Sequence, residues 1–484
     1  MNYKMMGRFN AFILLIEAVF MIPALLISLF RGEQAAFQSF LVSMGIILAI
    51  AGILALLGRK ATLDFYAREG MICVGASWIL LSALGCLPFV FSGAIPHYVD
   101  AFFEMVSGFT TTGSSVITDL SVIPKGIIYW RSFSNWLGGM GVLVFLLALL
   151  PVSGRNQGFT MHLLRAESPG PDVGKLVPKM RQTAGVLYLC YLALSVINLV
   201  FLLAGGMSPF DAVCTMFSTA GTGGFGVYND SFASFSPYIQ TVTAVFMLLF
   251  GINFSCFYLL LIRQFRNVFK DEELRLYLGI TFASVVLIAL NIYHIYGNVA
   301  DTLRHSFFQV SSLITSTGFS STNFDLWPSF SKTILLLLMF FGACAGSTGG
   351  GLKMARLLLL LKSMCRNISQ ILHPNKVKVI RVNSKPIDEK IIANTSAYFF
   401  VYMLLILLSF LIVSLDGFSI ETGFSAVLSC FNNMGPGFDA VGPVQNFSGL
   451  SILSKLVLSF DMLAGRLEIF PILILFNPRA WKRG

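Results

Sequence analysis

Ten apolar runs, each long enough to cross a lipid bilayer, constrain the fold of this chain more than any other feature. A spanning helix needs about 20 mostly apolar residues. The runs occupy approximately residues 9–30, 37–58, 69–93, 127–151, 183–205, 237–262, 275–297, 330–361, 395–416 and 450–476. Because 56% of the residues are hydrophobic and only 12% are charged, a water-soluble globule would be unable to bury the apolar surface. We therefore expect an all-α, polytopic membrane protein embedded in a lipid bilayer.

The basic residues gather in alternate segments between these runs. Lysines and arginines cluster near both termini, around residue 60, and in segments 155–181, 263–275 and 353–390. Segments rich in Lys and Arg stay on the cytoplasmic side of a membrane. The pattern therefore predicts that both termini are cytoplasmic. It also accounts for the net charge of +10 without a nucleic-acid partner.

Four segments on the predicted outer side share one pattern: an aromatic residue or Ile, two small polar residues, a variable residue and Gly. They are Phe109–Gly113, Phe217–Gly221, Ile314–Gly318 and Phe431–Gly435. A semi-apolar stretch too short to span the membrane precedes each of them, at 98–109, 208–217, 300–314 and 419–431. Non-helical backbone at membrane depth must be buried in protein or line a water-filled cavity. We expect four pseudo-symmetric repeats of span, re-entrant pore loop and span around a central pore.

The repeats divide the chain into five parts. We expect an N-terminal transmembrane hairpin at 1–66 and a first pore repeat at 67–155. A cytoplasmic loop and the second repeat follow at 156–265. The third repeat, with a broken second span, covers 266–385, and the fourth covers 386–484.

The predicted selectivity filter takes three residues from each of the four segments. A ring of backbone carbonyls replaces the water shell of a cation, and glycine permits the backbone turn that orients these oxygens. Small polar residues also occur in ordinary loops, but a fourfold recurrence between spans argues against that interpretation. The predicted filter residues are Thr111, Thr112, Gly113, Thr219, Ala220, Gly221, Ser316, Thr317, Gly318, Asn433, Met434 and Gly435.

A glycine-rich segment, 342–351, interrupts the eighth apolar run. Each glycine costs a helix about 1 kcal/mol relative to alanine, so we expect the span to break there. Two interpretations stay open. The small residues allow close packing of helices, or the broken segment obstructs the pore as a gate. The candidate gate residues in this region are Gly346, Gly349, Gly350, Gly351 and Lys353.

Arg466 is the sixth candidate gate residue, and it lies near the middle of the last apolar run. A charge at that depth is costly and is usually functional. One interpretation is a structural ion pair with Asp461 or Glu468. The other is that Arg466 faces the permeation path and repels cations until the gate opens.

Acidic residues precede each of the four motifs, at Asp100, Asp211, Asp301 and Glu421. Acids at a helix start cap exposed N–H groups and complement the helix dipole. They also raise the local concentration of cations at a pore mouth. We expect capping as their main role.

With these four filter segments, the glycine-rich break and the intramembrane arginine, the chain resembles the Trk/Ktr/HKT superfamily of potassium transporters, most closely its TrkH-type membrane subunits. The resemblance covers essentially the whole chain. It implies the ion-conducting, gated subunit of a bacterial potassium-uptake system in the inner membrane. It also implies a homodimer that binds a cytoplasmic, nucleotide-binding regulatory subunit of the TrkA type. The nucleotide would then be held only by that partner, and no covalent cofactor is expected.

The same resemblance bears on ion selectivity. A serine in place of the first filter glycine is associated with sodium permeation in this superfamily, whereas all four positions here are glycine. Potassium, held by filter carbonyls, is therefore the expected metal ion. The fourth segment departs from the Thr/Ser pattern of the others, because Asn432, Asn433 and Met434 precede its glycine.

Two rival functions are alternatives to a channel-like path. A secondary transporter that couples K⁺ to H⁺ or Na⁺ commonly has inverted repeats, whereas these repeats all start from the cytoplasmic side. An integral membrane enzyme would need a catalytic grouping. The apolar runs carry no Ser/His/Asp set, and the five His and eight Cys show no metal-ligand spacing.

Overall fold

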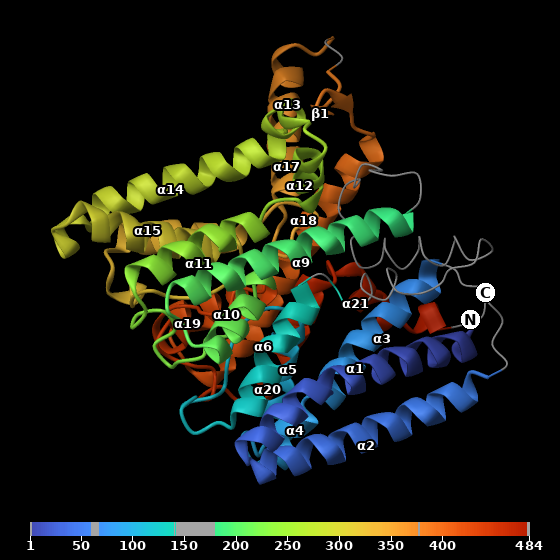
Figure 1. The fold of residues 1–484 in the computed structure, drawn as a ribbon. Coiled ribbons are helices and arrows are strands. Elements are labelled where there is room, and N and C mark those ends of the chain that lie inside the picture. Colours follow the sequence, from blue (N-terminus) through green and yellow to red (C-terminus); the bar gives the residue numbers. More distant parts are fainter. Residues whose placement is uncertain (1, 60–66, 140, 142–179, 376–377, 482–484) are drawn as a thin grey trace.

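The computed structural model describes residues 2–59, 67–139, 141, 180–375 and 378–481. An N-terminal hairpin consists of α1 (Tyr3–Arg31) and α2 (Gln34–Leu57), which run side by side (Figure 1). Gly32 ends α1 in the left-handed conformation at φ 71°, so only two residues connect the helices. The carboxylate of Glu33 in this connection accepts hydrogen bonds from the Lys125 and Gly126 N–H groups at 2.7 and 3.1 Å. The hairpin is thereby fixed to the start of a pore-repeat helix.

Four span–re-entrant helix–span units follow the hairpin. The first unit contains α3 (Ala67–Gly85), α4 (Leu87–Phe91), α5 (Tyr98–Phe109) and α6 (Lys125–Gly139). The second unit contains α9 (Met180–Ala204), α10 (Pro209–Ala220), α11 (Pro237–Phe250), α12 (Phe254–Leu261) and α13 (Phe265–Phe269). The third contains α14 (Glu272–Tyr296), α15 (Val299–Ile314), η2 (Phe324–Leu326), α16 (Ser329–Phe340) and α17 (Met354–Leu372). The fourth contains α18 (Glu389–Val413), η3 (Ser414–Asp416), α19 (Ile420–Phe431), η4 (Asp439–Val441), α20 (Ile452–Arg466), α21 (Phe470–Leu475) and η5 (Pro478–Trp481). The predicted all-α repeat architecture is confirmed.

The described residues also contain a small antiparallel β-hairpin, in which β1 (Arg381–Val382) pairs with β2 (Lys385–Pro386). Together with α13 and part of α17 it projects from one end of the helix bundle (Figure 1). The predicted repeat boundaries at 66 and 155, the end of the fourth run and the cytoplasmic loop before 180 lie outside the described residues.

Within the described residues, three of the predicted runs do not form a single spanning helix. Run 237–262 bends by 91° between α11 and α12, where Gly251 ends one helix and the Asn253 side chain caps the next. Run 450–476 is interrupted after Arg466, and Ile469 there has a positive φ of 69°. The break in run 330–361 is the one that the glycines predicted, and it separates α16 from α17. Hydropathy alone missed the other two because apolar residues continue through them.

The outer faces of the helices are apolar, as a lipid environment requires. Large side chains there remain exposed, including Phe282 on α14 at 72% and Phe400 on α18 at 69%. Six described helices are long and apolar enough to span a membrane, or seven if the bent α11–α12 pair counts as one. At the two described ends of the chain, the Tyr3 hydroxyl donates to the Trp481 carbonyl at 2.7 Å, so these ends lie together.

Candidate ion-conduction site

Each re-entrant helix ends in the same backbone turn, which defines how the four loops correspond. In the first loop, Thr111 N donates to Gly108 O at 3.1 Å and Thr112 N donates to Ser107 O at 2.8 Å. The corresponding second bonds elsewhere are Gly223 N to Ser218 O, Thr317 N to Ser312 O and Met434 N to Ser429 O, at 2.8, 2.8 and 2.9 Å. Four serines thus occupy one equivalent position.

The backbone angles give the same correspondence. Four residues that follow the helices have a positive φ although they are not glycine: Thr111 (55°), Thr222 (52°), Ser316 (55°) and Asn433 (56°). Two residues later, four glycines have a positive φ: Gly113 (89°), Gly224 (70°), Gly318 (85°) and Gly435 (93°). A left-handed conformation is costly for an ordinary side chain, so these turns are held by their surroundings.

The register predicted for the second loop is wrong by three residues. Thr219 and Ala220 lie in the last turn of α10, and Gly221 caps that helix with an ordinary φ of −71°. The residues equivalent to Thr111–Gly113 are 222–224. A hydroxyl residue lies two positions before both Gly221 and Gly224, so this spacing does not distinguish the two glycines in the sequence.

The four loops pack into a closed ring. A Cβ atom added to Gly113 would lie 2.5 Å from the Gly223 carbonyl oxygen of the second loop. The other contacts continue in the same direction around the ring: Gly224 to Thr317 O (2.0 Å), Gly318 to Met434 O (2.0 Å) and Gly435 back to Thr112 O (2.9 Å). Each glycine therefore leaves room for a carbonyl of the next loop, and a side chain at these positions would push the ring apart.

The side chains of the ring loops are buried in protein. The side chains of Thr111, Thr112, Ser316, Thr317 and Asn433 have no exposed surface. Behind the loops, small residues of the spans bring the helices close. A Cβ added to Gly138 would lie 1.8 Å from Phe109 O, and one added to Gly465 would lie 1.9 Å from Phe431 O. Gly138, Gly465 and their helices α6 and α20 thus support the first and fourth loops in equivalent ways.

The glycine-rich segment lies directly against the third and fourth loops. Gly350 N donates to Ser316 Oγ at 2.5 Å. A Cβ added to Gly349 would lie 2.9 Å from Thr315 O, and one added to Gly350 would lie 2.7 Å from Asn432 O. The break between α16 and α17 thus places this segment beside the helix-side ends of the filter loops.

Several contacts hold the glycine-rich segment in this position. The carboxylate of Glu273, at the start of α14, accepts from Ala345 N at 2.6 Å and from Ala355 N at 3.0 Å. Phe254 N of α12 donates to Gly346 O at 3.1 Å. Lys353 Nζ donates to Gly349 O within the segment. Glu273 was not a candidate in the sequence, because nothing there links it to a segment some 70 residues later.

Arg466 joins the last span to the glycine-rich segment and to α6. Its guanidinium donates to Thr348 O at 2.8 Å, to Gly139 O at 2.7 Å and to Gly138 O. The two acids considered as its ion-pair partners bind other groups: Asp461 accepts from the Ser409 hydroxyl at 2.7 Å, and Glu468 pairs with Arg356. Of the two interpretations of Arg466, the geometry therefore favours contact with pore elements over an ion pair with Asp461 or Glu468.

The four outer acids lie in the first helical turn, two or three residues after the capping position. The capping side chains are instead Ser208, Asn298 and Ser419, which accept from first-turn N–H groups of α10, α15 and α19. The acids have other partners within the described residues: Asp100 pairs with Lys455 (2.7 Å), Asp301 with Arg304 (2.8 Å) and Glu421 with Lys332 (2.7 Å), and Asp211 accepts from Tyr228 (2.9 Å). The prediction that these acids cap the helices is therefore wrong: where a side chain caps the helix, it belongs to a different residue.

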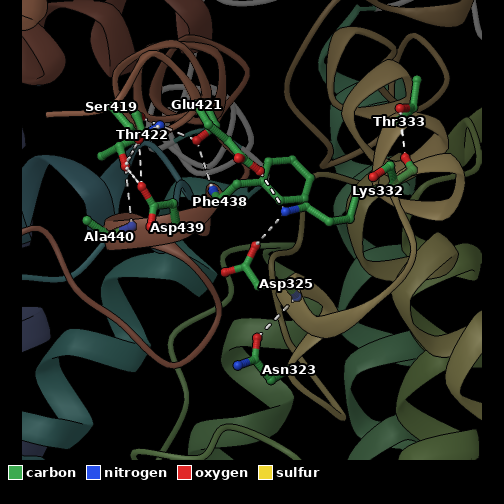
Figure 2. A network of polar contacts seen from close by, with 12 residues as sticks. Asn323, Asp325, Lys332, Thr333, Ser419, Glu421, Thr422, Phe438, Asp439 and Ala440 are labelled. Carbon is green, nitrogen blue, oxygen red and sulfur yellow. Dashed lines mark hydrogen bonds and ion pairs between the residues drawn. The ribbon is translucent and has the colours of Figure 1, made fainter. Parts of the chain in front are cut away.

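Figure 2 shows the outer network that joins the third and fourth repeats. Lys332 of α16 reaches Glu421 of α19 and also lies 3.9 Å from Asp325 Oδ1. The lysine therefore sits between acids of two repeats, and its charge offsets theirs at the outer end of the bundle.

Asp439 forms the other half of this network (Figure 2). Its Oδ2 accepts from the Ser419 hydroxyl at 2.6 Å and from the Thr422 hydroxyl at 2.7 Å. These hydrogen bonds lower the pKa of Asp439 below its ordinary value, and the bond from Ser419 has the largest effect. The segment after the fourth loop is thereby fastened to the start of its own re-entrant helix.

Comparison with known proteins identifies relatives along the whole chain. A family model described as TrkH, a cation transport protein, matches residues 36–483. The Trk system potassium uptake protein TrkH of Escherichia coli K12 is 36% identical, with 100% of both chains covered. TrkG of the same strain is 33% identical, with 99% of each covered. The crystal structure of the potassium transporter TrkH from Vibrio parahaemolyticus matches with a TM-score of 0.87 and 32% identity, over 100% of both chains.

Proposed function

Because the chain belongs to the TrkH family of cation transport proteins, we propose that it conducts K⁺ across the bacterial inner membrane as the gated, pore-forming subunit of a Trk-type uptake system. The relatives named as potassium uptake proteins match it from end to end. The family is a transporter family and not an enzyme class.

The closed ring of four loops carries the proposal. In this account K⁺ passes between backbone carbonyls of residues 111–113, 222–224, 316–318 and 433–435. Carbonyl oxygens take the place of water around a cation. The positive φ of the four glycines supports it, because these angles let each loop turn where a neighbouring carbonyl approaches. The second loop is supported by the end of α10, at Thr219, Ala220 and Gly221.

The gate consists of Gly346, Gly349, Gly350, Gly351, Lys353 and Arg466. Its segment packs against the third and fourth loops, and Arg466 holds it through Thr348 O. In this position the segment obstructs the path, and the arginine adds a positive charge that repels cations. Conduction then requires both to move, which is a step that a partner can control.

Regulation follows from the system to which the relatives belong. We assign to this chain a homodimeric state, two cytoplasmic termini and a nucleotide-binding, TrkA-like regulatory subunit on the cytoplasmic side. Segment 362–390 is basic and includes the projecting end of α17 and the β1–β2 hairpin, which supports it as a contact surface. The repeat boundaries at 66, 155, 265 and 385 belong to the same proposal.

Ion flux into liposomes that contain the purified protein tests the function. We expect K⁺ and Rb⁺ to enter and Na⁺ and Li⁺ to be largely excluded, because only the larger ions match the carbonyl ring. Empty liposomes are the control. Equal flux of all four ions would indicate a non-selective pore. K⁺ flux that appears only with an imposed H⁺ or Na⁺ gradient would indicate a coupled transporter, and either result contradicts the proposal.

A further inference from the structure

The carbonyl two residues beyond the filter glycine is hydrogen-bonded to the preceding repeat at three of the four junctions. Ser115 O, after the first loop, accepts from Phe447 N of the fourth repeat at 2.8 Å. Ser320 O, after the third loop, accepts from Phe232 N of the second repeat, also at 2.8 Å. In both cases a backbone N–H ties one loop exit to its neighbour.

The second loop obtains the same bond in a different way. Gly226 O is the equivalent carbonyl, and it accepts from Arg131 Nη1 of α6 at 3.1 Å. The guanidinium also lies over the ring of Phe225, with Cζ 3.6 Å from the ring centre. A side chain of the first repeat thus replaces the backbone donor that holds the other two loop exits.

Arg131 is in turn held by Glu104 of the re-entrant helix α5. Arg131 Nε lies 2.6 Å from Glu104 Oε1, and the two side chains are 3% and 0% exposed. The same carboxylate accepts from Ser115 Oγ at 3.0 Å and from Val116 N at 2.8 Å. One buried ion pair therefore fastens the chain where it leaves the first loop and where it leaves the second.

The other re-entrant helices do not repeat this charge. The position of Glu104, three residues before the equivalent serine, is Thr215 in α10, Gln309 in α15 and Ala426 in α19. Gln309 Nε2 donates to Ser320 Oγ at 3.1 Å, so a neutral amide contacts the matching loop exit of the third repeat. A charged side chain is thus not required for the backbone to adopt this conformation after a loop. The ion pair between the first and second repeats therefore has another role.

We propose that Glu104 and Arg131 are positioning residues for ion selectivity, which fix the distance between the first and second filter loops. The inference rests on the proposed function of these loops. A cation as small as Na⁺ is held well only if the carbonyls move inward, so a rigid junction disfavours it. A buried, hydrogen-bonded ion pair resists displacement because any separation leaves a charge unpaired in a low dielectric.

The design of the variants follows from the burial of the pair. Removal of one partner alone leaves the other charge buried, which destabilises a protein. The double variant Glu104→Gln/Arg131→Met removes both charges at similar volume, and its amide reproduces the chemistry of Gln309. Arg131→Lys keeps the charge, but lysine has no planar fork to reach Glu104 and Gly226 together. Asp301→Asn is the matched control, since it makes the same acid-to-amide change in α15 at a partly exposed ion pair.

The experiment measures reversal potentials with opposing K⁺ and Na⁺ gradients in planar bilayers, on full-length protein that elutes as wild type in size exclusion. We expect the double variant and Arg131→Lys to conduct K⁺ but to lose about tenfold in K⁺-over-Na⁺ permeability ratio, the factor that corresponds to about 1.4 kcal/mol. Asp301→Asn keeps the wild-type ratio. If the double variant does not fold, Arg131→Lys decides the matter alone.

Two other outcomes are distinguishable. An unchanged ratio in a folded double variant or in Arg131→Lys overturns the positioning role while the filter assignment stands. A wild-type protein that passes Na⁺ as readily as K⁺ contradicts the proposed function itself.

Discussion

Replacing Arg466 with alanine raises the basal K⁺ flux of the purified protein about tenfold or more. The substitution removes the bonds to Thr348 O, Gly138 O and Gly139 O, which join the glycine-rich segment to two spans. Each hydrogen bond from a charged group contributes about 1.5–3 kcal/mol. A change of about 1.4 kcal/mol alters an equilibrium tenfold, so the loss of even one bond shifts the equilibrium between closed and open gate by about tenfold or more. The substitution also removes the positive charge that the proposed gate uses to repel cations. Liposome flux without any regulatory partner measures the effect.

Two companion variants separate the causes. Arg466→Lys keeps the charge but reaches fewer carbonyls, so an intermediate flux indicates that the hydrogen bonds and the charge both contribute. Arg479→Ala removes an exposed arginine from the C-terminal segment and leaves the flux unchanged. A folded Arg466→Ala protein with wild-type or lower flux would show that this arginine does not close the pore.

Gly224→Ala abolishes K⁺-selective flux, whereas Gly206→Ala leaves it largely intact. Both glycines have a positive φ, of 70° and 82°, so both substitutions strain the backbone by about 1–2 kcal/mol. Only Gly224 faces the ring: an added Cβ would lie 2.0 Å from Thr317 O, while nothing lies within 4 Å of one added to Gly206. The comparison therefore isolates the displacement of a carbonyl from the strain of the turn.

The distance from the added Cβ to the neighbouring carbonyl oxygen also ranks the expected effect of alanine at the other ring glycines. Gly435→Ala is the mildest of the four, because its added Cβ would lie 2.9 Å from Thr112 O, compared with 2.0 Å at Gly318. Flux and K⁺-over-Na⁺ selectivity are measured for each variant in liposomes. Selective flux in Gly224→Ala equal to that of Gly206→Ala would exclude Gly224 from the filter.

The sequence predicted most of what depends on local pattern. The four re-entrant helices lie where short semi-apolar stretches precede a glycine, and the break after Phe340 lies where glycines gather. The bend after Phe250 was not predicted. Only two polar residues, near Gly251, mark it within an apolar run, and hydropathy averages over them.

The sequence failed where contacts over long separations decide the structure. Gly221, Gly223 and Gly224 all follow α10, and only the backbone bonds and the approach of Thr317 O select Gly224 as the ring position. Neither Glu273 nor Arg131 is predicted from the sequence, because their partners belong to distant segments of the chain. The charge of Arg466 signalled a function, but its carbonyl partners come from two other repeats, and no local pattern identifies them.

The most direct test of the central claim is a crystal structure grown in Tl⁺ or Rb⁺, with the ion located by its anomalous scattering. The account predicts an anomalous peak enclosed by the carbonyls of Thr112, Gly223, Thr317 and Met434, and no peak there when the crystals are grown in Li⁺. Strong ion peaks elsewhere in the protein, with none inside this ring, would contradict the assignment of these four loops as the path of the ion.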